Sequence, residues 1–149
     1  MRFEKRVALM VVGIVAALHC GCAGTYVSKY AYDDGLKTNV PVKDGNCYDA
    51  SILLGVPAKR AKDIAEKVIA AVDATIEENG DTSIKAQRNR HIGLFVGSGG
   101  EELVVNLQAV GNDRTYVTIT TKTGFVGGAG QRAWSCEIVD KMAAMAARN

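Results

Sequence analysis

Residue types able to carry out hydrolytic chemistry are scarce in this chain of 149 residues. It has two histidines, and one of them, His19, lies at the end of an apolar N-terminal run. The other, His91, follows Arg88-Asn89-Arg90. A catalytic histidine needs an orienting carboxylate and a nucleophile beside it, and nothing in the sequence marks either partner. Several serines lack the setting of a nucleophile elbow: Ser51, Ser83, Ser98 and Ser135. We therefore expect a polar hairpin turn at His91.

Two pairs of adjacent carboxylates could be considered for acid/base chemistry. Glu77-Glu78 is expected at a helix end and Glu101-Glu102 beside a turn, and in both places solvated charge is the ordinary state. Neither pair has a recognisable acid/base arrangement. The sequence therefore predicts no catalytic residues.

The glycine-rich segment Gly124–Gly130 precedes a predicted helix, and helix N-termini bind anions. A phosphate-binding loop ends in Gly-Lys-Ser/Thr, whereas this one ends in Gly130-Gln131-Arg132. It also follows a predicted antiparallel meander and not a βαβ unit. We expect a tight strand-to-helix connection, with Gly130, Gln131 and Arg132 as candidate contacts for a small anion. No cofactor is implied.

Four cysteines could form disulfides or bind metal. Cys20 and Cys22 lie at the end of the apolar N-terminal run, which leaves Cys47 and Cys136 in the body of the chain. In an exported protein these two form a candidate disulfide; two separately buried thiols are the alternative. Together with His91 they have no paired ligand spacing, so no metal site is expected.

The N-terminus predicts export. Basic residues within Met1–Arg6 precede an uninterrupted apolar run, Val7–Leu18, and small residues follow it. This is the pattern of a secretory signal peptide. A transmembrane helix needs about 20 apolar residues to cross roughly 30 Å of hydrocarbon, and this run is shorter.

The same segment resembles the lipobox of bacterial lipoprotein precursors, in which a cysteine receives acyl chains such as palmitate and becomes the new N-terminus. Gly21 before Cys22 fits the small residue of that family, while His19 departs from its usual aliphatic position. Cys20 fits less well because the bulky His19 would precede the cut. The resemblance implies lipidation of Cys22 and a membrane anchor of several chains. Ala23 permits the outer membrane, facing the periplasm, if the source is Gram-negative; a secreted protein without lipid is the alternative.

Composition bounds the rest of the chain. Without residues 1–21, 128 residues remain with 15 basic and 15 acidic side chains, so this part is formally neutral. That length suits one domain. A neutral domain lacks the basic surface of a nucleic-acid-binding protein. We expect a signal peptide over 1–21, a lipid-anchored tether with a candidate edge strand over 22–46, and one domain over 47–149.

Hydrophobic periodicity predicts an α+β fold. Helices are predicted from Ala58 to about Glu78, ended by Asn79-Gly80, and from about Gln131 to Ala147. Strands are predicted over six ranges: 36–42, 47–56, 83–88, 92–96, 103–109 and 116–123. This order predicts a two-layer sandwich in which a mainly antiparallel sheet of four to five strands carries two helices on one face. Tyrosines 26, 30 and 32 are expected to pack on the domain's edge, with lipid headgroups or a partner as alternatives.

The chain also resembles a group of short envelope lipoproteins classed as a domain of unknown function. The matching pieces are Gly21-Cys22-Ala23, Tyr32–Leu36, the helix from Ala58, the meander over 102–123 and Gly130–Met142. Residues 39–46 and the segment around His91 depart from that pattern. The resemblance implies no activity.

Taken together, these features predict a cell-envelope lipoprotein that is not an enzyme. It would act as a binding or structural module for a protein, glycan or lipid partner, through its exposed sheet face or an edge strand. The alternative is a small envelope hydrolase or ligand-binding protein that uses His91 or the loop 124–132. No nucleic-acid partner is expected.

Overall fold

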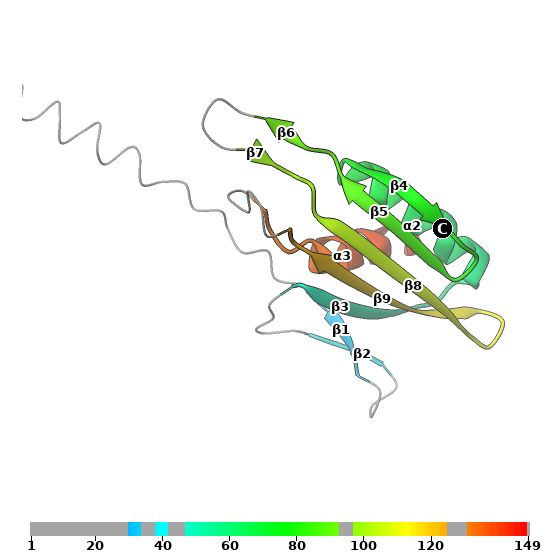
Figure 1. Ribbon diagram of the computed structural model, residues 1–149. Helices are drawn as coiled ribbons and strands as arrows, with labels where there is room; N and C mark the ends of the chain where they lie inside the picture. Colours follow the sequence, from blue (N-terminus) through cyan, green and yellow to red (C-terminus); the bar gives the residue numbers. More distant parts are fainter. Residues whose placement is uncertain (1–29, 34–37, 42–46, 93–96, 125–130, 149) are drawn as a thin grey trace, which may run out of the picture.

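The computed structural model describes residues 30–33, 38–41, 47–92, 97–124 and 131–148. A five-stranded antiparallel sheet forms one layer (Figure 1). In spatial order its strands are β3 (Asp49–Leu54), β9 (Arg114–Lys122), β8 (Glu102–Val110), β5 (Ser83–Arg88) and β4 (Ala74–Asn79). The long strands β8 and β9 pair with Leu107 opposite Val117. Gly111, at a φ of 71°, makes the turn between them in a conformation that favours glycine.

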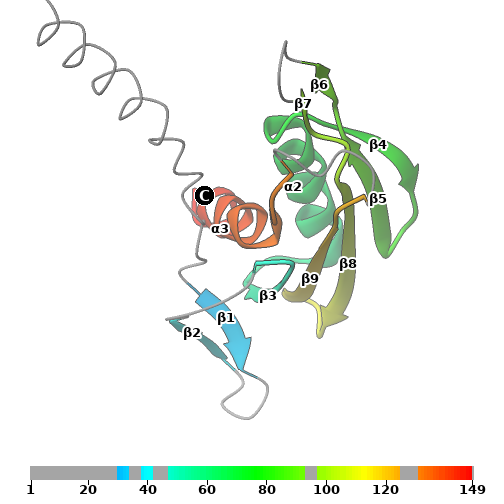
Figure 2. The same cartoon turned by 60° about the vertical axis from the view of Figure 1, so that its left-hand side comes forward.

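Two helices, α2 (Ala58–Ala71) and α3 (Ser135–Ala146), form the second layer and cover one face of the sheet (Figure 2). Alternate residues of β8 and β9 point at them and are buried, as period-two strands require. The largest wholly buried apolar side chains come from both layers: Val68, Ile69, Ile84, Leu103, Val105, Val117, Ile119, Ile138, Val139 and Met142. The predicted α+β sandwich is confirmed. In the described part of the chain, neither helix combines the length and apolar character needed to cross a membrane.

Helix α2 is shorter than predicted, because β4 takes the place of its expected last two turns. Asp73 ends the helix in the left-handed region, at a φ of 58°, and the backbone N–H of Asn89 donates to the Asp73 carbonyl oxygen. Ile76, which continues the helical stripe in the sequence, instead pairs with Ala86 of β5. Its β-branched side chain suits a strand, and the neighbouring strand satisfies its backbone.

Helix α3 also differs from the prediction, beginning at Ser135 and not near Gln131. The Gln131 side chain donates to the Gly99 carbonyl oxygen, and the Trp134 backbone N–H donates to Thr121 Oγ1. These bonds to other parts of the chain hold residues 131–134 outside the helix.

A separate hairpin, β1 (Tyr30–Asp33) with β2 (Thr38–Pro41), packs on edge strand β3 (Figures 1 and 2). The Asn39 amide donates to the Leu53 carbonyl oxygen and accepts from the Leu53 N–H, both at 2.9 Å. The rings of Tyr32 and Tyr116 lie 5.0 Å apart, so Tyr32 packs on the domain's edge as expected. The strand predicted within residues 36–42 is therefore β2, which pairs with β1.

A third sheet, made of the two short strands β6 (His91–Ile92) and β7 (Gly97–Ser98), lies beyond the ends of β5 and β8 (Figure 1). The rest of the strand predicted over 92–96 lies outside the described residues. The pair carries His91 away from the body of the sheet.

Candidate functional site

His91 has the acidic partner that the sequence did not reveal. Its Nε2 lies 2.5 Å from Oδ2 of Asp73, the residue that ends α2. Asn89 Nδ2 donates to the other oxygen of that carboxylate at 2.8 Å, and Thr75 donates to Asn89. The hydrogen bond from His91, followed by the one from Asn89, lowers the pKa of the Asp73 carboxyl below its ordinary value of 3.8. The sequence does not mark this partner, because it comes from the end of a helix 18 residues earlier in the chain.

The chemical capacity of this pair is limited by its exposure. The His91 side chain is 63% exposed and that of Asp73 46%, so water surrounds both. The carboxylate can orient the imidazole, which is one half of a nucleophile-activating arrangement. Within the described residues, the hydrogen bond of His91 goes to Asp73, and the second half of the arrangement, a nucleophile bonded to the imidazole, is not seen there.

The candidate anion contacts at the start of the last helix are engaged within the protein. Gln131 Nε2 donates to the Gly99 carbonyl oxygen, and the Arg132 N–H donates to Glu101 Oε1 at 3.1 Å. The Arg132 guanidinium donates to Glu137. Gly130 lies outside the described residues. An anion at Arg132 would have to displace one carboxylate and approach another.

Glu101 is the centre of a buried cluster that sequence analysis missed. It was expected in solvent beside a turn, and its side chain is wholly buried. Its Oε1 accepts from Arg132 N–H and from Trp134 Nε1, while Oε2 is buried and has no hydrogen-bond partner among the described residues. Gly99 and Gly100, with φ of 92° and 83°, turn the chain so that Glu101 enters the interior. The double glycine before a charged residue was the one available signal.

Two guanidinium groups lie over the Trp134 ring of this cluster. The Cζ atoms of Arg88 and Arg132 are 3.8 and 3.7 Å from the ring centroid. Arg88 also donates to the Val72 carbonyl oxygen and lies 3.9 Å from Asp73. Cation–π contacts of this kind stabilise by about 1 kcal/mol each. Arg88 thus joins the His91 pair to the buried cluster, and the arrangement is consistent with a structural role.

The candidate disulfide between Cys47 and Cys136 is confirmed, with Sγ atoms 2.11 Å apart and Cα atoms 5.1 Å apart. A chain of hydrogen bonds lies beside it. The Trp134 N–H donates to Thr121 Oγ1, whose hydroxyl bonds Ser135 Oγ, which donates to the Tyr48 carbonyl oxygen. Because Ser135 has one hydroxyl proton and gives it to Tyr48, Thr121 must be the donor to Ser135. The disulfide and this chain hold the start of α3 against β3 and β9.

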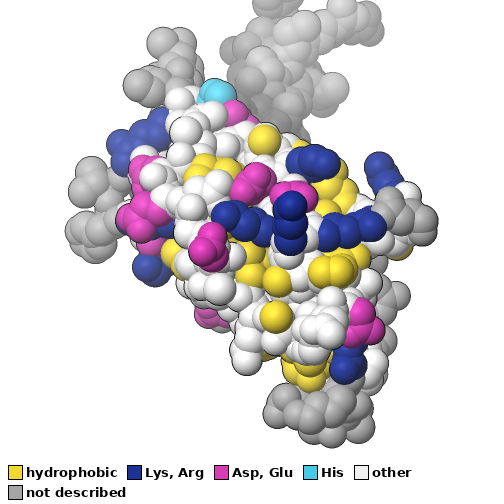
Figure 3. Space-filling model, turned by 90° about the vertical axis from the view of Figure 1, so that its right-hand side faces the viewer, with side chains coloured by type: hydrophobic (Ala, Val, Ile, Leu, Met, Phe, Trp, Pro, Cys, Tyr) yellow, Lys and Arg dark blue, Asp and Glu magenta, His cyan; other side chains and the backbone are white. Residues whose placement is uncertain are grey.

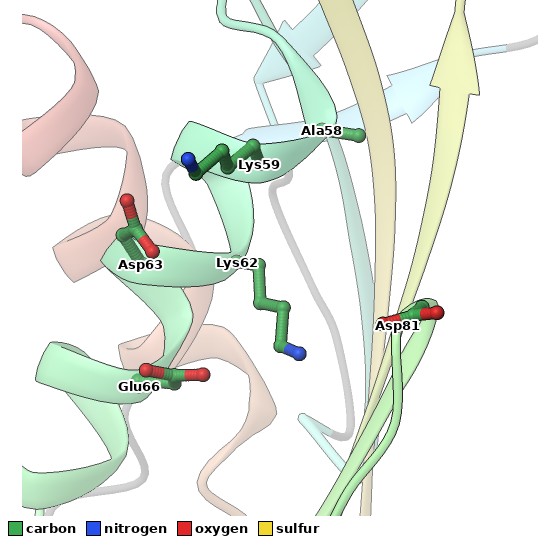
Figure 4. Close-up of a pocket in the computed structure, with 6 residues that line it drawn as sticks. All are labelled: Ala58, Lys59, Lys62, Asp63, Glu66 and Asp81. Atoms are coloured by element: carbon green, nitrogen blue, oxygen red, sulfur yellow. The ribbon is translucent and has the colours of Figure 1, made fainter.

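A hollow of about 390 Å³ opens between the first turns of α2 and the β4–β5 turn. In Figure 4, Lys62 extends from the helix toward the turn that carries Asp81. The remaining lining residues are Ala58, Lys59, Asp63 and Glu66. With two lysines against three carboxylates, the hollow favours neither an anion nor a cation. Figure 3 shows acidic and basic side chains lying close together on one face of the molecule, among hydrophobic and uncharged groups.

A second hollow, of about 360 Å³, lies over edge strand β3 and its neighbour β9. We call it the β3–β9 groove; its lining residues are Asp49, Ala50, Ser51, Tyr116, Thr118, Ile119 and Thr120. Ser51, Thr118 and Thr120 alternate along their strands with buried residues that face the helices. The groove therefore lies on the sheet face that the helices leave uncovered.

The predicted lipidation site Cys22, with Cys20 and the signal segment, lies outside the described residues. Among those that the structure does describe, no three acidic, histidine or cysteine side chains group as metal ligands would. A scan against protein-family models and a search of curated proteins found no match to this chain.

Proposed function

We propose that this chain is a cell-envelope lipoprotein, anchored by lipid on Cys22, that binds a partner and is not an enzyme. The observation that carries the proposal is the disulfide Cys47–Cys136 in a chain that begins with a signal-peptide pattern. Disulfides persist outside the cytoplasm, so the bond supports export independently of the N-terminal residues. In a Gram-negative source, Ala23 permits the outer membrane, with the domain facing the periplasm.

The surface that supports binding is the open face of the sheet. The helices cover the other face, and the candidate anion donors Gln131 and Arg132 are engaged internally. The β3–β9 groove lies within this open face and is lined by polar side chains that strand geometry directs outward. We assign partner binding to this face.

The anchor is tested by mass spectrometry of the mature N-terminus from membrane fractions. We expect acyl chains on Cys22 in the wild type, the same modification in Cys20→Ser, and loss of membrane association in Cys22→Ser. Acylation of Cys20 would overturn the assignment of the modified residue. An unmodified N-terminus in the culture medium would instead indicate a secreted protein without lipid.

One observation favours a second candidate, a small envelope hydrolase: the carboxylate of Asp73 lies where it would orient His91. This candidate predicts that purified protein hydrolyses p-nitrophenyl acetate above the rate of free imidazole, and that His91→Asn and Asp73→Asn both abolish the excess. An equal rate for wild type and His91→Asn would exclude catalysis by His91 on this ester.

A further inference from the structure

The β1–β2 hairpin already occupies the C-terminal half of the β3 edge, which restricts how a partner can bind there. Asn39 pairs with both backbone groups of Leu53, as one residue of a neighbouring strand would. Addition of a partner strand along β3 would have to displace the β1–β2 hairpin. The uncovered sheet face needs no such displacement.

The uncovered face is rich in hydroxyl and amide groups. One row crosses four strands in register and consists of Ser83, Asn106, Thr118 and Ser51. The lysines of this face are paired with carboxylates, since Lys122 bonds Glu102 at 2.7 Å and Lys85 lies 3.6 Å from both Glu78 and Glu102. These lysines are thus neutralised within the protein, and the row of hydroxyl and amide groups offers neutral donors and acceptors.

The β3–β9 groove concentrates this chemistry beside an aromatic wall. Hydroxyls of Ser51, Thr118 and Thr120 and the carboxylate of Asp49 line it, together with Tyr116, whose ring packs on Tyr32 of the hairpin. Asp49 accepts from Thr120 at 2.8 Å, which holds the carboxylate in place with its second oxygen free of that bond. No lysine or arginine is among the described lining residues.

These groups define the ligand. A carboxylate and hydroxyls, without a cation, repel phosphates and other anions and suit an uncharged ligand with many hydroxyl donors. A tyrosine ring offers an apolar flank with a polar tip, against which the C–H face of a sugar ring can pack. The volume lies at the small end of the range for ligand pockets and suits one or two sugar units. We propose that the β3–β9 groove binds a neutral glycan chain, an inference that rests on the proposed function of an envelope binding module.

Isothermal titration calorimetry of the full chain in detergent tests this, with tetra-N-acetylchitotetraose and cellotetraose as neutral probes and tetragalacturonate as an anionic probe. We expect saturable binding of at least one neutral probe, with a Kd on the order of 1 mM or lower, and no binding of the anionic probe. Asp49→Asn and Thr118→Val are each expected to weaken binding about tenfold, the effect of losing one hydrogen bond to a polar ligand.

Matched controls are Asp81→Asn and Thr82→Val, the same chemical changes in the β4–β5 turn, and both should bind as the wild type does. Asn at position 49 can still accept from Thr120, so that variant should fold normally, as unchanged circular dichroism would verify. The inference is overturned if neither neutral probe binds at about 10 mM, if tetragalacturonate binds equally well, or if the control variants weaken binding as much as the groove variants.

The experiment separates this inference from the proposed function. If Cys22 is acylated and no glycan binds, the proposed lipoprotein holds and the proposed glycan ligand is excluded. If a glycan binds and Cys22 is not acylated, the glycan ligand holds and the lipid anchor is excluded. A photocrosslinker placed at Ser51 is also tested in intact cells. If it captures a protein while neutral glycans fail to bind, the groove binds a protein partner and not a glycan.

Discussion

Asp73 and Glu101, two acidic residues near Arg88, lie in opposite environments. Asp73 is exposed and hydrogen-bonded by His91 and Asn89, whereas Glu101 is wholly buried and accepts from Arg132 and Trp134. The first can respond to solution pH, because protonation of an exposed acid is readily reached. Glu101 accepts hydrogen bonds from two buried donors, and no water could take its place as their acceptor.

Glu101→Ala is expected to lower the free energy of unfolding by about 2–4 kcal/mol, because it strands the Arg132 N–H and Trp134 Nε1–H in the interior. Urea unfolding followed by far-UV circular dichroism measures this. Glu102→Ala is the matched control: its ion pairs are on the surface, and we expect a loss of about 1 kcal/mol or less. Equal losses would show that Glu101 is not the buried acceptor.

The lowered pKa of Asp73 predicts that part of the free energy of unfolding is lost in acid. Its pKa is lowered on folding, so the stability it contributes is present above its unfolded pKa, near 4, and is lost as pH falls through the lower folded value. Asp73→Asn should therefore flatten the dependence of unfolding free energy on pH below about pH 4. Urea titrations at several acidic pH values measure the slope, with Asp113→Asn of the exposed β8–β9 turn as control. A slope unchanged in Asp73→Asn contradicts the assignment.

At the scale of elements, long-range hydrogen bonds set the boundaries. Asp73 ends α2 with bonds from Asn89, and Thr121 and Gly99 hold residues 131–134 out of α3. The β1–β2 hairpin protects an edge strand in the same way, with the Asn39 amide in place of a neighbouring strand's peptide group. Unprotected edges invite pairing with another chain.

Asn39→Asp should loosen the hairpin, because the carboxylate cannot donate to the Leu53 carbonyl oxygen and is repelled by it. We expect faster hydrogen exchange of the Leu53 amide and concentration-dependent self-association through the exposed edge. Exchange mass spectrometry and sedimentation velocity measure the two effects. Asn112→Asp in the β8–β9 turn makes the same change away from β3 and should alter neither; an unaffected Asn39→Asp protein would mean that the edge is protected by other contacts.

The molecule as a whole is a two-layer sandwich whose layers are also joined covalently. Cys47 precedes edge strand β3 and Cys136 lies in the first turn of α3, 89 residues later. The disulfide therefore links the helical layer to the edge of the sheet, next to the strand that forms one side of the β3–β9 groove. Stability and groove geometry should both depend on it.

The double variant Cys47→Ser/Cys136→Ser should lose about 4 kcal/mol of unfolding free energy in the chain-entropy model, since the closed loop is long. Urea unfolding measures the loss. Reduction of the wild type with dithiothreitol should produce a similar loss and leave the variant unchanged. A wild type that is insensitive to the reductant even when unfolded in its presence would contradict a bond between these cysteines.

What the sequence determined by itself is local and periodic. Leu103, Val105 and Leu107 predicted a strand with one buried face, and the stripe of α2 predicted a helix, because burial of one face leaves a period in the chain. The class α+β, the strands β5, β8 and β9, and the candidate pair Cys47–Cys136 followed from such patterns and from the count of cysteines.

Tertiary structure decided what depends on partners distant in the chain. The end of α2 at Asp73 depends on Asn89, the burial of Glu101 on Arg132 and Trp134, and the pairing of His91 on the end of α2. No periodic pattern or characteristic spacing in the sequence marks the residues that make these contacts. Each forms only once the sheet has brought β5, β8 and the two helices together, so the chemistry of His91 and the existence of the β3–β9 groove could be read only from the folded chain.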